Sequence, residues 1–271
     1  MADASQRGEG GDRQRLLLII PAYNEEGRIG ATLEAYVACF RAAGWPALSV
    51  LVVLNGCRDR TREVVERARA GRPEINLIEF RRPIGKGGAI RAGFDRIEEA
   101  DLVGFVDADM ATPPEAFHQL LLPLRDYDAV IASRWLPGSQ VECQPLRRRF
   151  ASRIFHLMVQ ATLGLPFRDT QCGAKVLRRE ALLAVRRELF IADMAFDVNL
   201  LFLLRRAGFR ILEHPTIWFD RRGSKVRLVR TSLAMFLSVV RLRLIYSPLR
   251  PLYERNQGLF RRVHDWLVRR D

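Results

Sequence analysis

Two carboxylates separated by one residue, Asp107 and Asp109, directly follow the apolar run Leu102–Val106. Because side chains alternate faces along a β-strand, both carboxylates project the same way at the carboxyl end of a strand, where open α/β sheets bind ligands. Mg²⁺ and Mn²⁺ take one or two protein carboxylates and complete their coordination with water and substrate phosphate oxygens. The pair therefore indicates a metal site. The alternative is two solvated acids that open a helix starting at Pro113 or Pro114.

Polar side chains with other chemistry follow the neighbouring apolar runs. Tyr23 and Asn55 come after the first two runs, and the glycine-flanked Lys86 comes after the third. A tyrosine ring stacks on a base, an asparagine amide hydrogen-bonds a base edge or ribose, and a lysine in a glycine loop reaches phosphate. Each residue also has an ordinary role, at the edge of a core, in a turn or as a solvated charge. Their positions at successive strand ends favour a nucleotide site.

Lysine is rare in this chain. Only three of the 44 basic residues are lysine, namely Lys86, Lys175 and Lys225, and each lies in a segment that contains glycine. A lysine ammonium is a compact charge, whereas an arginine guanidinium is a planar fork. The three positions are therefore candidates for sites that need an ammonium.

Apolar periodicity predicts strands that alternate with helices. The first half is expected to form strands over Leu16–Ile20, Leu48–Leu54, Ile75–Phe80 and Leu102–Val106, with helices over Ile29–Ala43, Thr61–Ala70 and Ala89–Glu98. The second half adds helices over Pro114–Leu124, Gln144–Gln160 and Ala195–Ala207 and strands over Ala129–Ala132, Lys175–Leu177 and Phe209–Glu213. This alternation indicates a right-handed βαβ series and an α/β fold with a mostly parallel sheet flanked by helices.

The C-terminal region is basic and amphipathic. Residues 221–271 contain thirteen basic and three acidic side chains, and so carry most of the formal net charge of +13. The stretch Val226–Tyr246 has an apolar face bordered by arginines, and a similar mixture follows over Leu259–Arg270. This pattern is typical of a helix that lies in the membrane surface, although a helix that covers the sheet is the alternative. The charge favours an anionic partner, namely phospholipid, lipid phosphate or nucleic acid, over a solvated tail.

Composition excludes several classes of protein. The 271 residues are 48% hydrophobic, and an apolar run of about 18 residues, which a spanning helix needs, does not occur. Residues 1–14 are expected to be a disordered tail that lacks the apolar segment of a secretory signal. The four cysteines lack zinc-ligand spacing and fit a reducing compartment. The dinucleotide fingerprint and the P-loop pattern are both missing. We expect one main domain over 15–225 and basic amphipathic helices over 226–271.

Seven short motifs run through the chain: Pro21-Ala-Tyr-Asn-Glu-Glu26, Gly85-Lys-Gly-Gly-Ala-Ile-Arg91, Asp107-Ala-Asp109, Ala132-Ser-Arg134, Asp169-Thr-Gln-Cys-Gly173 with Lys175, Ala195-Phe-Asp-Val198 and Gly223-Ser-Lys225. Together they resemble the family 2 glycosyltransferases of GT-A fold, in particular the dolichyl-phosphate β-glucosyltransferases and related polyprenyl-phosphate sugar synthases. The resemblance covers about residues 15–250. It implies a Rossmann-like GT-A domain with membrane-associated C-terminal helices.

The resemblance also implies roles for the motif residues. Those expected to border the nucleotide-sugar are Pro21, Tyr23, Glu25, Asn55, Lys86 and Asp107, and those expected to hold Mg²⁺ or Mn²⁺ against its diphosphate are Asp107 and Asp109. The sugar and acceptor site is expected to include Arg134, Asp169, Gln171, Lys175, Asp197 and Lys225. Asp109, Arg134 and Asp197 are the expected catalytic residues. Two positions depart from the family pattern, because Asn55 and Asn199 stand where acidic residues are common, and the first departure leaves the identity of the base open.

The expected reaction is inverting transfer of a sugar, with UDP-linked glucose favoured by the resemblance, to a polyprenyl or dolichyl phosphate. A phosphate acceptor is largely ionised near neutral pH and needs no general base. One alternative is transfer to a hydroxyl with Asp197 as the base. Another is a basic nucleic-acid-binding protein, which lacks support because no nucleic-acid motif occurs. The expected partners are a nucleotide-sugar, a lipid phosphate and the membrane surface. The protein is expected to be cytoplasmic and peripheral on the inner face of the membrane, and the oligomeric state stays open.

Overall fold

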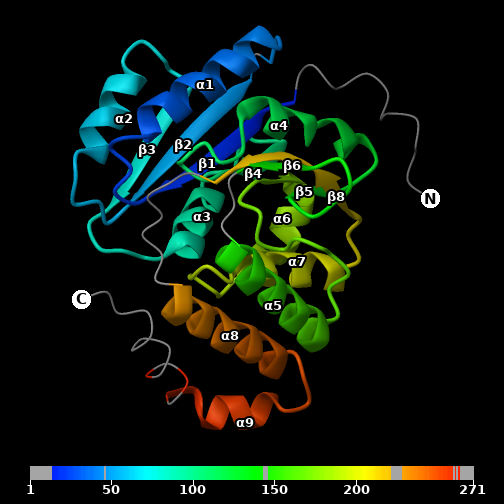
Figure 1. The fold of residues 1–271 in the computed structure, drawn as a ribbon. Coiled ribbons are helices and arrows are strands. Elements are labelled where there is room, and N and C mark those ends of the chain that lie inside the picture. Colours follow the sequence, from blue (N-terminus) through cyan, green and yellow to red (C-terminus); the bar gives the residue numbers. More distant parts are fainter. Residues whose placement is uncertain are drawn as a thin grey trace.

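The structure is a computed structural model that describes residues 14–45, 47–142, 146–220, 228–258, 260 and 262. Most of the predicted tail over 1–14, the predicted boundary at residue 225 and most of the second arginine-containing stretch after residue 258 lie outside the described residues. Figure 1 shows a central sheet with helices on both sides.

Within the described residues, a seven-stranded sheet with the order β3-β2-β1-β4-β7-β5-β8 forms the centre of the molecule. Its strands are β1 (Leu16–Ala22), β2 (Leu48–Asn55), β3 (Ile75–Phe80), β4 (Leu102–Phe105), β5 (Ala129–Ser133), β7 (Lys175–Arg178) and β8 (Ile211–Pro215). Neighbouring strands run parallel, except that β7 is antiparallel to both β4 and β5. Strands such as β1 and β2 are continuous apolar runs because both faces of the sheet are covered. The predicted mostly parallel sheet is confirmed.

Helices cover the two faces of the sheet in separate layers. The first face carries α1 (Ile29–Ala42), α2 (Thr61–Arg69) and α4 (Pro114–Gln119), and the second carries α3 (Lys86–Phe94), α6 (Arg179–Val185) and α7 (Phe196–Arg206). An outer layer of α5 (Leu146–Leu163), α8 (Leu228–Ile245) and α9 (Arg250–Arg255) packs outside α7 (Figure 1). A small two-stranded sheet pairs β6 (Gln140–Glu142) with β9 (Ile217–Phe219), and 3₁₀ turns span Leu122–Arg125 and Arg186–Glu188.

Several predicted boundaries were wrong. The helix expected over Ala89–Glu98 is α3, which begins three residues earlier and ends at Phe94. The earlier start was missed because glycine has a low helix propensity, and Gly87 and Gly88 lie in the first turn. Packing requires glycine there, because an added Cβ at Gly87 would lie 2.5 Å from the Cβ of Phe196 in α7. The helix expected from Pro114 to Leu124 ends at Gln119, and a 3₁₀ turn with Pro123 follows. Apolar periodicity did not predict the short elements α6, α9, β6 and β9.

Gly104 determines how closely α4 approaches β4, the strand that leads into the two carboxylates. An added Cβ at Gly104 would lie 2.6 Å from Cζ of Phe117 and 3.2 Å from the carbonyl oxygen of Lys175. Both neighbours are buried, so neither has free space into which it could move.

Gly104→Ala is therefore expected to lower the free energy of unfolding by about 1–3 kcal/mol, the usual cost of overpacking a core. Urea denaturation measures the change. The matched control is Gly27→Ala, where an added Cβ meets nothing within 4 Å, and its expected effect is within about 0.5 kcal/mol. Equal losses in both variants would contradict the packing argument.

Candidate active site

The carboxyl ends of β1, β2 and β4 lie side by side because these strands are adjacent and parallel. Pro21 lies at the end of β1, with Tyr23 and Glu25 after it, and Asn55 is the last residue of β2. Asp107 and Asp109 follow β4. The structure thus brings the polar residues predicted from separate strand ends to one edge of the sheet.

Asp107 forms an ion pair with Lys86, whose Nζ lies 2.6 Å from Oδ1 of the carboxylate. Lys86 is the first residue of α3, and the residue before it, Gly85, has a φ of +81° that favours glycine. Burial disfavours the charge on both groups, but the opposite charge outweighs burial in each case. The pKa of Asp107 is therefore lowered, chiefly by Lys86, and the pKa of Lys86 is raised, chiefly by Asp107.

The second oxygen of Asp107 lies against the backbone of Gly173. A Cβ at Gly173 would overlap Oδ2 of Asp107, so only glycine fits there. The carbonyl of the preceding residue, Cys172, accepts a hydrogen bond of 2.5 Å from Nζ of Lys175. Burial raises the pKa of the Cys172 thiol to about 11, which keeps it protonated near neutral pH and excludes it as a thiolate nucleophile.

Asp109 is less well compensated than Asp107. The backbone N–H of Ala111 donates to its Oδ1 over 3.0 Å, and the nearest cation, Arg28, lies 3.9 Å from its Oδ2. Arg28 is itself held by Glu25, whose Oε2 lies 2.7 Å from its Nε. Burial and then the charge of Asp107 raise the pKa of Asp109. A bound cation would stabilise the Asp109 carboxylate against both burial and the charge of Asp107.

The donor set at this edge fits a hard divalent cation that also binds substrate. The side chains of Asp107 and Asp109 are 35% and 28% exposed, so both are open to ligands. Among the described residues, no group of three or more His, Cys, Asp or Glu side chains could hold a metal. A cation here would draw its remaining ligands from phosphate and water, as Mg²⁺ and Mn²⁺ do.

A second ion pair joins Arg134, just after β5, to Asp169. The guanidinium donates from Nε to Oδ2 over 2.7 Å and from Nη2 to Oδ1 over 3.0 Å, and it lies 5.1 Å from the ring centroid of Trp218. Burial opposes both charges, but pairing lowers the pKa of Asp169 and raises that of Arg134. Glu213 of β8 fixes the loop between α5 and β7, which contains Asp169, because its Oε1 accepts a 2.6 Å bond from the backbone N–H of Asp169.

A third ion pair, between Lys175 and Asp197, is buried beneath the edge. Nζ of Lys175 lies 2.6 Å from Oδ1 of Asp197, and the two side chains are 0% and 2% exposed. The ammonium also lies 5.6 Å from the ring centroid of Phe105. Lys175 and Arg134 both lower the pKa of Asp107 as well, after Lys86, so the three pairs form one electrostatic network. Asp197 therefore lies inside this network and not at the open edge, where a general base would meet an acceptor.

The other residues predicted for the site differ in burial and hydrogen bonding. Asn55 is buried, and its Oδ1 accepts a 2.7 Å bond from the backbone N–H of Ile84, so it anchors the loop before Lys86. Tyr23 is half-buried, and Nε2 of Gln171 is buried without a hydrogen-bond partner among the described residues. Lys225 lies outside the described residues.

Sequence reasoning missed three residues that shape this site, namely Arg28, Gly173 and Glu213. Arg28 follows Glu25 at a spacing of three, which is the available signal for their ion pair. Gly173 was seen as part of a motif, but its contact with Asp107 depends on strand pairing between β4 and β7. Glu213 gives no local signal.

A mostly parallel sheet with carboxylates and cations at the carboxyl ends of its strands places the protein among the open α/β proteins, which bind their ligands at this edge. The family model described as glycosyl transferase family 2 matches residues 17–186. The chain therefore belongs to glycosyltransferase family 2.

Curated relatives agree with this assignment. The chain is 34% identical over 230 residues to "Glycosyltransferase AglD" of Haloferax volcanii, covering 83% of this chain and 36% of the relative. It is 30% identical to "Dolichyl-phosphate beta-glucosyltransferase ALG5C" of Trichomonas vaginalis, with 78% of this chain and 65% of the relative covered. It is 32% identical to "Undecaprenyl-phosphate mannosyltransferase" of Micrococcus luteus, with 76% and 84% covered. The chain thus spans about a third of the first relative and just under two thirds of the second.

Solved structures share the fold. Glucosyl-3-phosphoglycerate synthase from Mycobacterium tuberculosis, in complex with phosphoglyceric acid, aligns with a TM-score of 0.68 at 17% identity, covering 92% of this chain and 88% of that chain. The same synthase has been crystallised with Mn²⁺, UDP and glucosyl-3-phosphoglycerate.

Removing one partner of the buried pair is expected to be costly. Lys175→Met leaves the carboxylate of Asp197 buried and uncompensated, and should lower the free energy of unfolding by about 3–5 kcal/mol. The double variant Lys175→Met/Asp197→Leu removes both charges and should lose less than Lys175→Met alone.

Urea unfolding of both variants tests this prediction. Glu254→Gln is the matched control, because it breaks the exposed pair of Glu254 with Arg250, and its cost should lie within about 1 kcal/mol. A double variant less stable than the single would show that the ion pair itself is not the source of the cost.

Proposed function

We propose that this protein transfers a sugar from a nucleotide-sugar to the phosphate of a polyprenyl or dolichyl phosphate, with inversion at the anomeric carbon. The observation that carries the proposal is the edge of the sheet, where Lys86, Asp107 and Asp109 lie in one electrostatic network with Arg134. The names of the Trichomonas and Micrococcus relatives, which both contain a polyprenyl phosphate, support this choice of acceptor.

A divalent cation, Mg²⁺ or Mn²⁺, would be held by Asp109 together with Asp107, and when bound it stabilises the diphosphate that departs from the sugar. Burial and then the charge of Asp107 raise the pKa of Asp109, and a cation there would offset both effects. The crystallisation of the mycobacterial synthase with Mn²⁺ and UDP supports the same cofactor.

Residues at the ends of β1 and β2 would bind the nucleotide. Pro21, Tyr23 and Glu25 lie at and after the end of β1, next to the strand that leads into Asp107, and would border the nucleotide. Lys86, which pairs with Asp107, would contact the donor phosphates. UDP is the proposed nucleotide and glucose the proposed sugar, following the dolichyl-phosphate glucosyltransferase relatives.

Arg134 would hold the acceptor phosphate. Asp169 takes two of the guanidinium's five N–H groups and fixes the plane of the fork. Within the part of the chain that the structure describes, the other N–H groups have no acceptor and are available to phosphate oxygens. Gln171, Lys175 and Asp197 then support the loop and the buried network beside it. An ionised phosphate oxygen attacks the anomeric carbon, and the diphosphate leaves with the electron pair of the broken bond. This route needs no base, which agrees with the burial of Asp197 in an ion pair.

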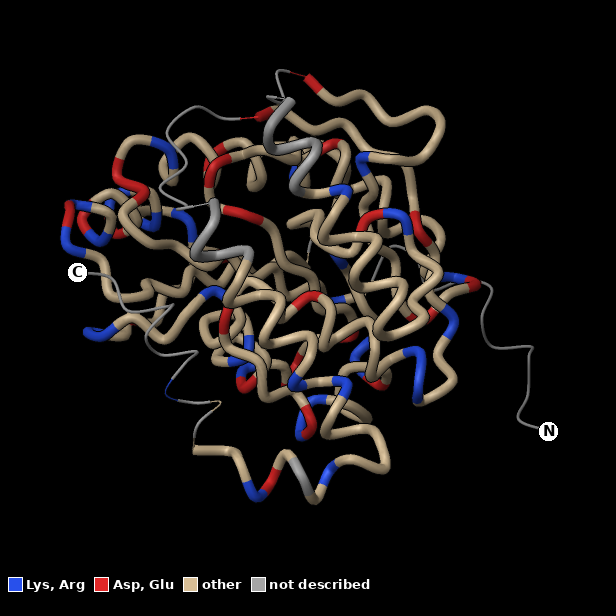
Figure 2. The backbone as a smooth tube through the Cα atoms, turned by 60° about the horizontal axis from the view of Figure 1, so that its bottom comes forward, with Lys and Arg blue, Asp and Glu red and all other residues tan. Residues whose placement is uncertain are grey.

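The acceptor lipid would lie at a membrane surface beside the outer helices. α8 buries Val239 and Leu242 against its neighbours, as a covering helix does, but leaves Leu233 and Phe236 exposed at 49% and 44%. In the described chain, none of the helices is long and apolar enough to span a bilayer. Figure 2 shows basic and acidic residues interspersed over the described backbone. We place the protein peripherally on the cytoplasmic face, with α8 toward the lipid.

Asp109→Asn is expected to reduce transfer of labelled sugar from UDP-glucose to a polyprenyl phosphate by at least about a hundredfold, because the amide loses the charge that holds the cation. Chelation with EDTA should abolish the wild-type activity, and Mn²⁺ or Mg²⁺ should restore it. The control Asp126→Asn changes an exposed carboxylate outside the site and should leave both stability and activity unchanged. Full activity of Asp109→Asn in the presence of Mn²⁺ would refute the metal role.

Comparison of two acceptors tests the phosphate chemistry directly. The wild-type protein should glycosylate a polyprenyl phosphate and leave the matching polyprenol unmodified, and the rate should depend only weakly on pH above about 7, where the phosphate is already ionised. Transfer to the polyprenol, with a rate that falls as a carboxylate protonates, would favour the hydroxyl alternative with Asp197 as base.

A further inference from the structure

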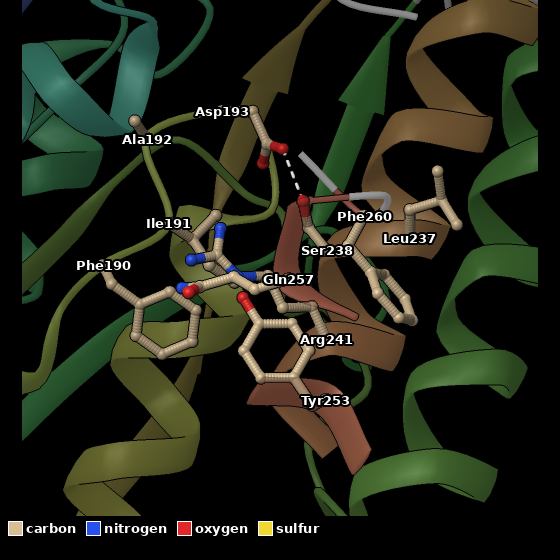
Figure 3. A pocket seen from close by; sticks show the side chains of 10 residues that line it. All are labelled: Phe190, Ile191, Ala192, Asp193, Leu237, Ser238, Arg241, Tyr253, Gln257 and Phe260. Carbon is tan, nitrogen blue, oxygen red and sulfur yellow. Dashed lines mark hydrogen bonds between the residues drawn. The ribbon is translucent and has the colours of Figure 1, made fainter. Parts of the chain in front are cut away.

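A pocket of about 200 Å³ lies between the loop Phe190–Asp193 and the outer helices α8 and α9. Figure 3 shows Phe190 and Tyr253 at one end of the pocket and Asp193 at the other. Its described lining residues do not include Asp107, Asp109 or Arg134, so it is separate from the candidate active site.

The guanidinium of Arg241, a residue of α8, has a buried donor that lacks an acceptor in this pocket. Its Nε is buried without a hydrogen-bond partner among the described residues. The guanidinium lies 4.7 Å from the ring centroid of Phe190 and 5.8 Å from that of Tyr253, so the two rings hold it in place. Burying a charged donor without an acceptor is costly. A ligand that supplies an anionic oxygen would remove this cost.

The carboxylate of Asp193, which also lines the pocket, is already paired. Oδ2 of Asp193 accepts a 2.6 Å bond from the hydroxyl of Ser238 (Figure 3). Oδ1 of Asp193 accepts a 2.7 Å bond from the backbone N–H of Ala195. None of the described side chains of the pocket accepts a hydrogen bond from Nε of Arg241, so a ligand that enters the pocket can supply the acceptor. Phosphate oxygens match the guanidinium fork. The volume is below the roughly 300–1,000 Å³ of pockets that enclose whole drug-sized ligands, which favours a phosphate group over a nucleotide.

The wall of the pocket also supports the start of α3. The carbonyl of Ala192 accepts a 3.1 Å bond from the backbone N–H of Gly88, and an added Cβ at Gly85 would overlap that carbonyl. The carbonyl of Ile191 would lie 2.9 Å from a Cβ at Gly87. The loop thus touches both the pocket and the turn that carries Lys86.

We propose that this pocket binds a phosphate group through Arg241, and that occupancy restrains the loop Phe190–Asp193 and with it the turn around Lys86. The binding site stands whether or not the chain transfers sugar to a lipid phosphate. The phosphate is either free in solution or the monoester headgroup of a membrane lipid, and the two sources are separable by experiment.

Hydrogen–deuterium exchange of the full chain tests the proposal with two probes, inorganic phosphate and vesicles of phosphatidylcholine containing phosphatidic acid. We expect slower exchange in peptides that cover residues 190–193 and 85–88. In Arg241→Gln the half-saturating concentration should rise at least about tenfold, the loss expected for a charge-assisted hydrogen bond of about 1.4 kcal/mol or more. Arg69→Gln, the same change at an exposed position on α2, should behave as the wild type.

Arg241→Lys distinguishes loss of binding from loss of folding. It keeps the positive charge and much of the aliphatic side chain but lacks the planar guanidinium, so its affinity for phosphate should lie between those of the wild type and Arg241→Gln. Protection by inorganic phosphate identifies a soluble ligand, and protection only by phosphatidic-acid vesicles, absent with pure phosphatidylcholine, identifies a lipid headgroup. Protection confined to residues 190–193 retains the site and overturns its link to Lys86. Absence of protection by either probe, or equal protection in wild type and Arg241→Gln, overturns the site.

Discussion

The ion pair between Lys86 and Asp107 is the interaction on which the candidate active site depends. It joins the first residue of α3 to the loop after β4, two segments that belong to different layers of the fold. Asp107 is partly buried, which disfavours its charge, and the ammonium of Lys86 compensates for this. Asp109 forms a longer ion pair of 3.9 Å with Arg28, and burial and the charge of Asp107 keep its pKa raised, so a further cation would stabilise it. One paired and one underpaired carboxylate is an arrangement that favours a single metal ion beside phosphates.

Close backbone packing makes this pair possible. Gly85 and Gly87 allow the loop Phe190–Asp193 to contact the start of α3. Gly173 allows the loop before β7 to contact the carboxylate of Asp107. Lys175 fixes the loop before β7, because its ammonium donates a hydrogen bond to the carbonyl of Cys172 and also pairs with Asp197. The position of Asp107 is thus fixed from both sides, because any Cβ at these glycines would displace the carboxylate or its counter-ion.

The same architecture explains two of the three lysines in an arginine-rich chain. Lys86 and Lys175 each place a compact ammonium 2.6 Å from one aspartate oxygen in buried surroundings, and Lys175 is fully enclosed. A planar guanidinium would need more space and more acceptors than either position offers. Arg134 shows the converse, because its fork meets both oxygens of Asp169 and its face stacks on Trp218. The residue type at each position follows from the shape of the partner.

The sequence by itself determined the α/β class, the positions of most strands and helices, and the chemistry at the strand ends, because apolar periodicity and the carboxylate spacing are local properties. It also determined the family, since the motifs that carry the resemblance lie in continuous segments. Only the tertiary structure decided which charges compensate one another. The reversal of β7, the placement of Asp197 inside a buried pair and the roles of Arg28, Gly173 and Glu213 all arise from contacts between distant segments. Local sequence does not encode these contacts, because a residue's partner across the sheet is set by strand order and packing and not by its neighbours along the chain.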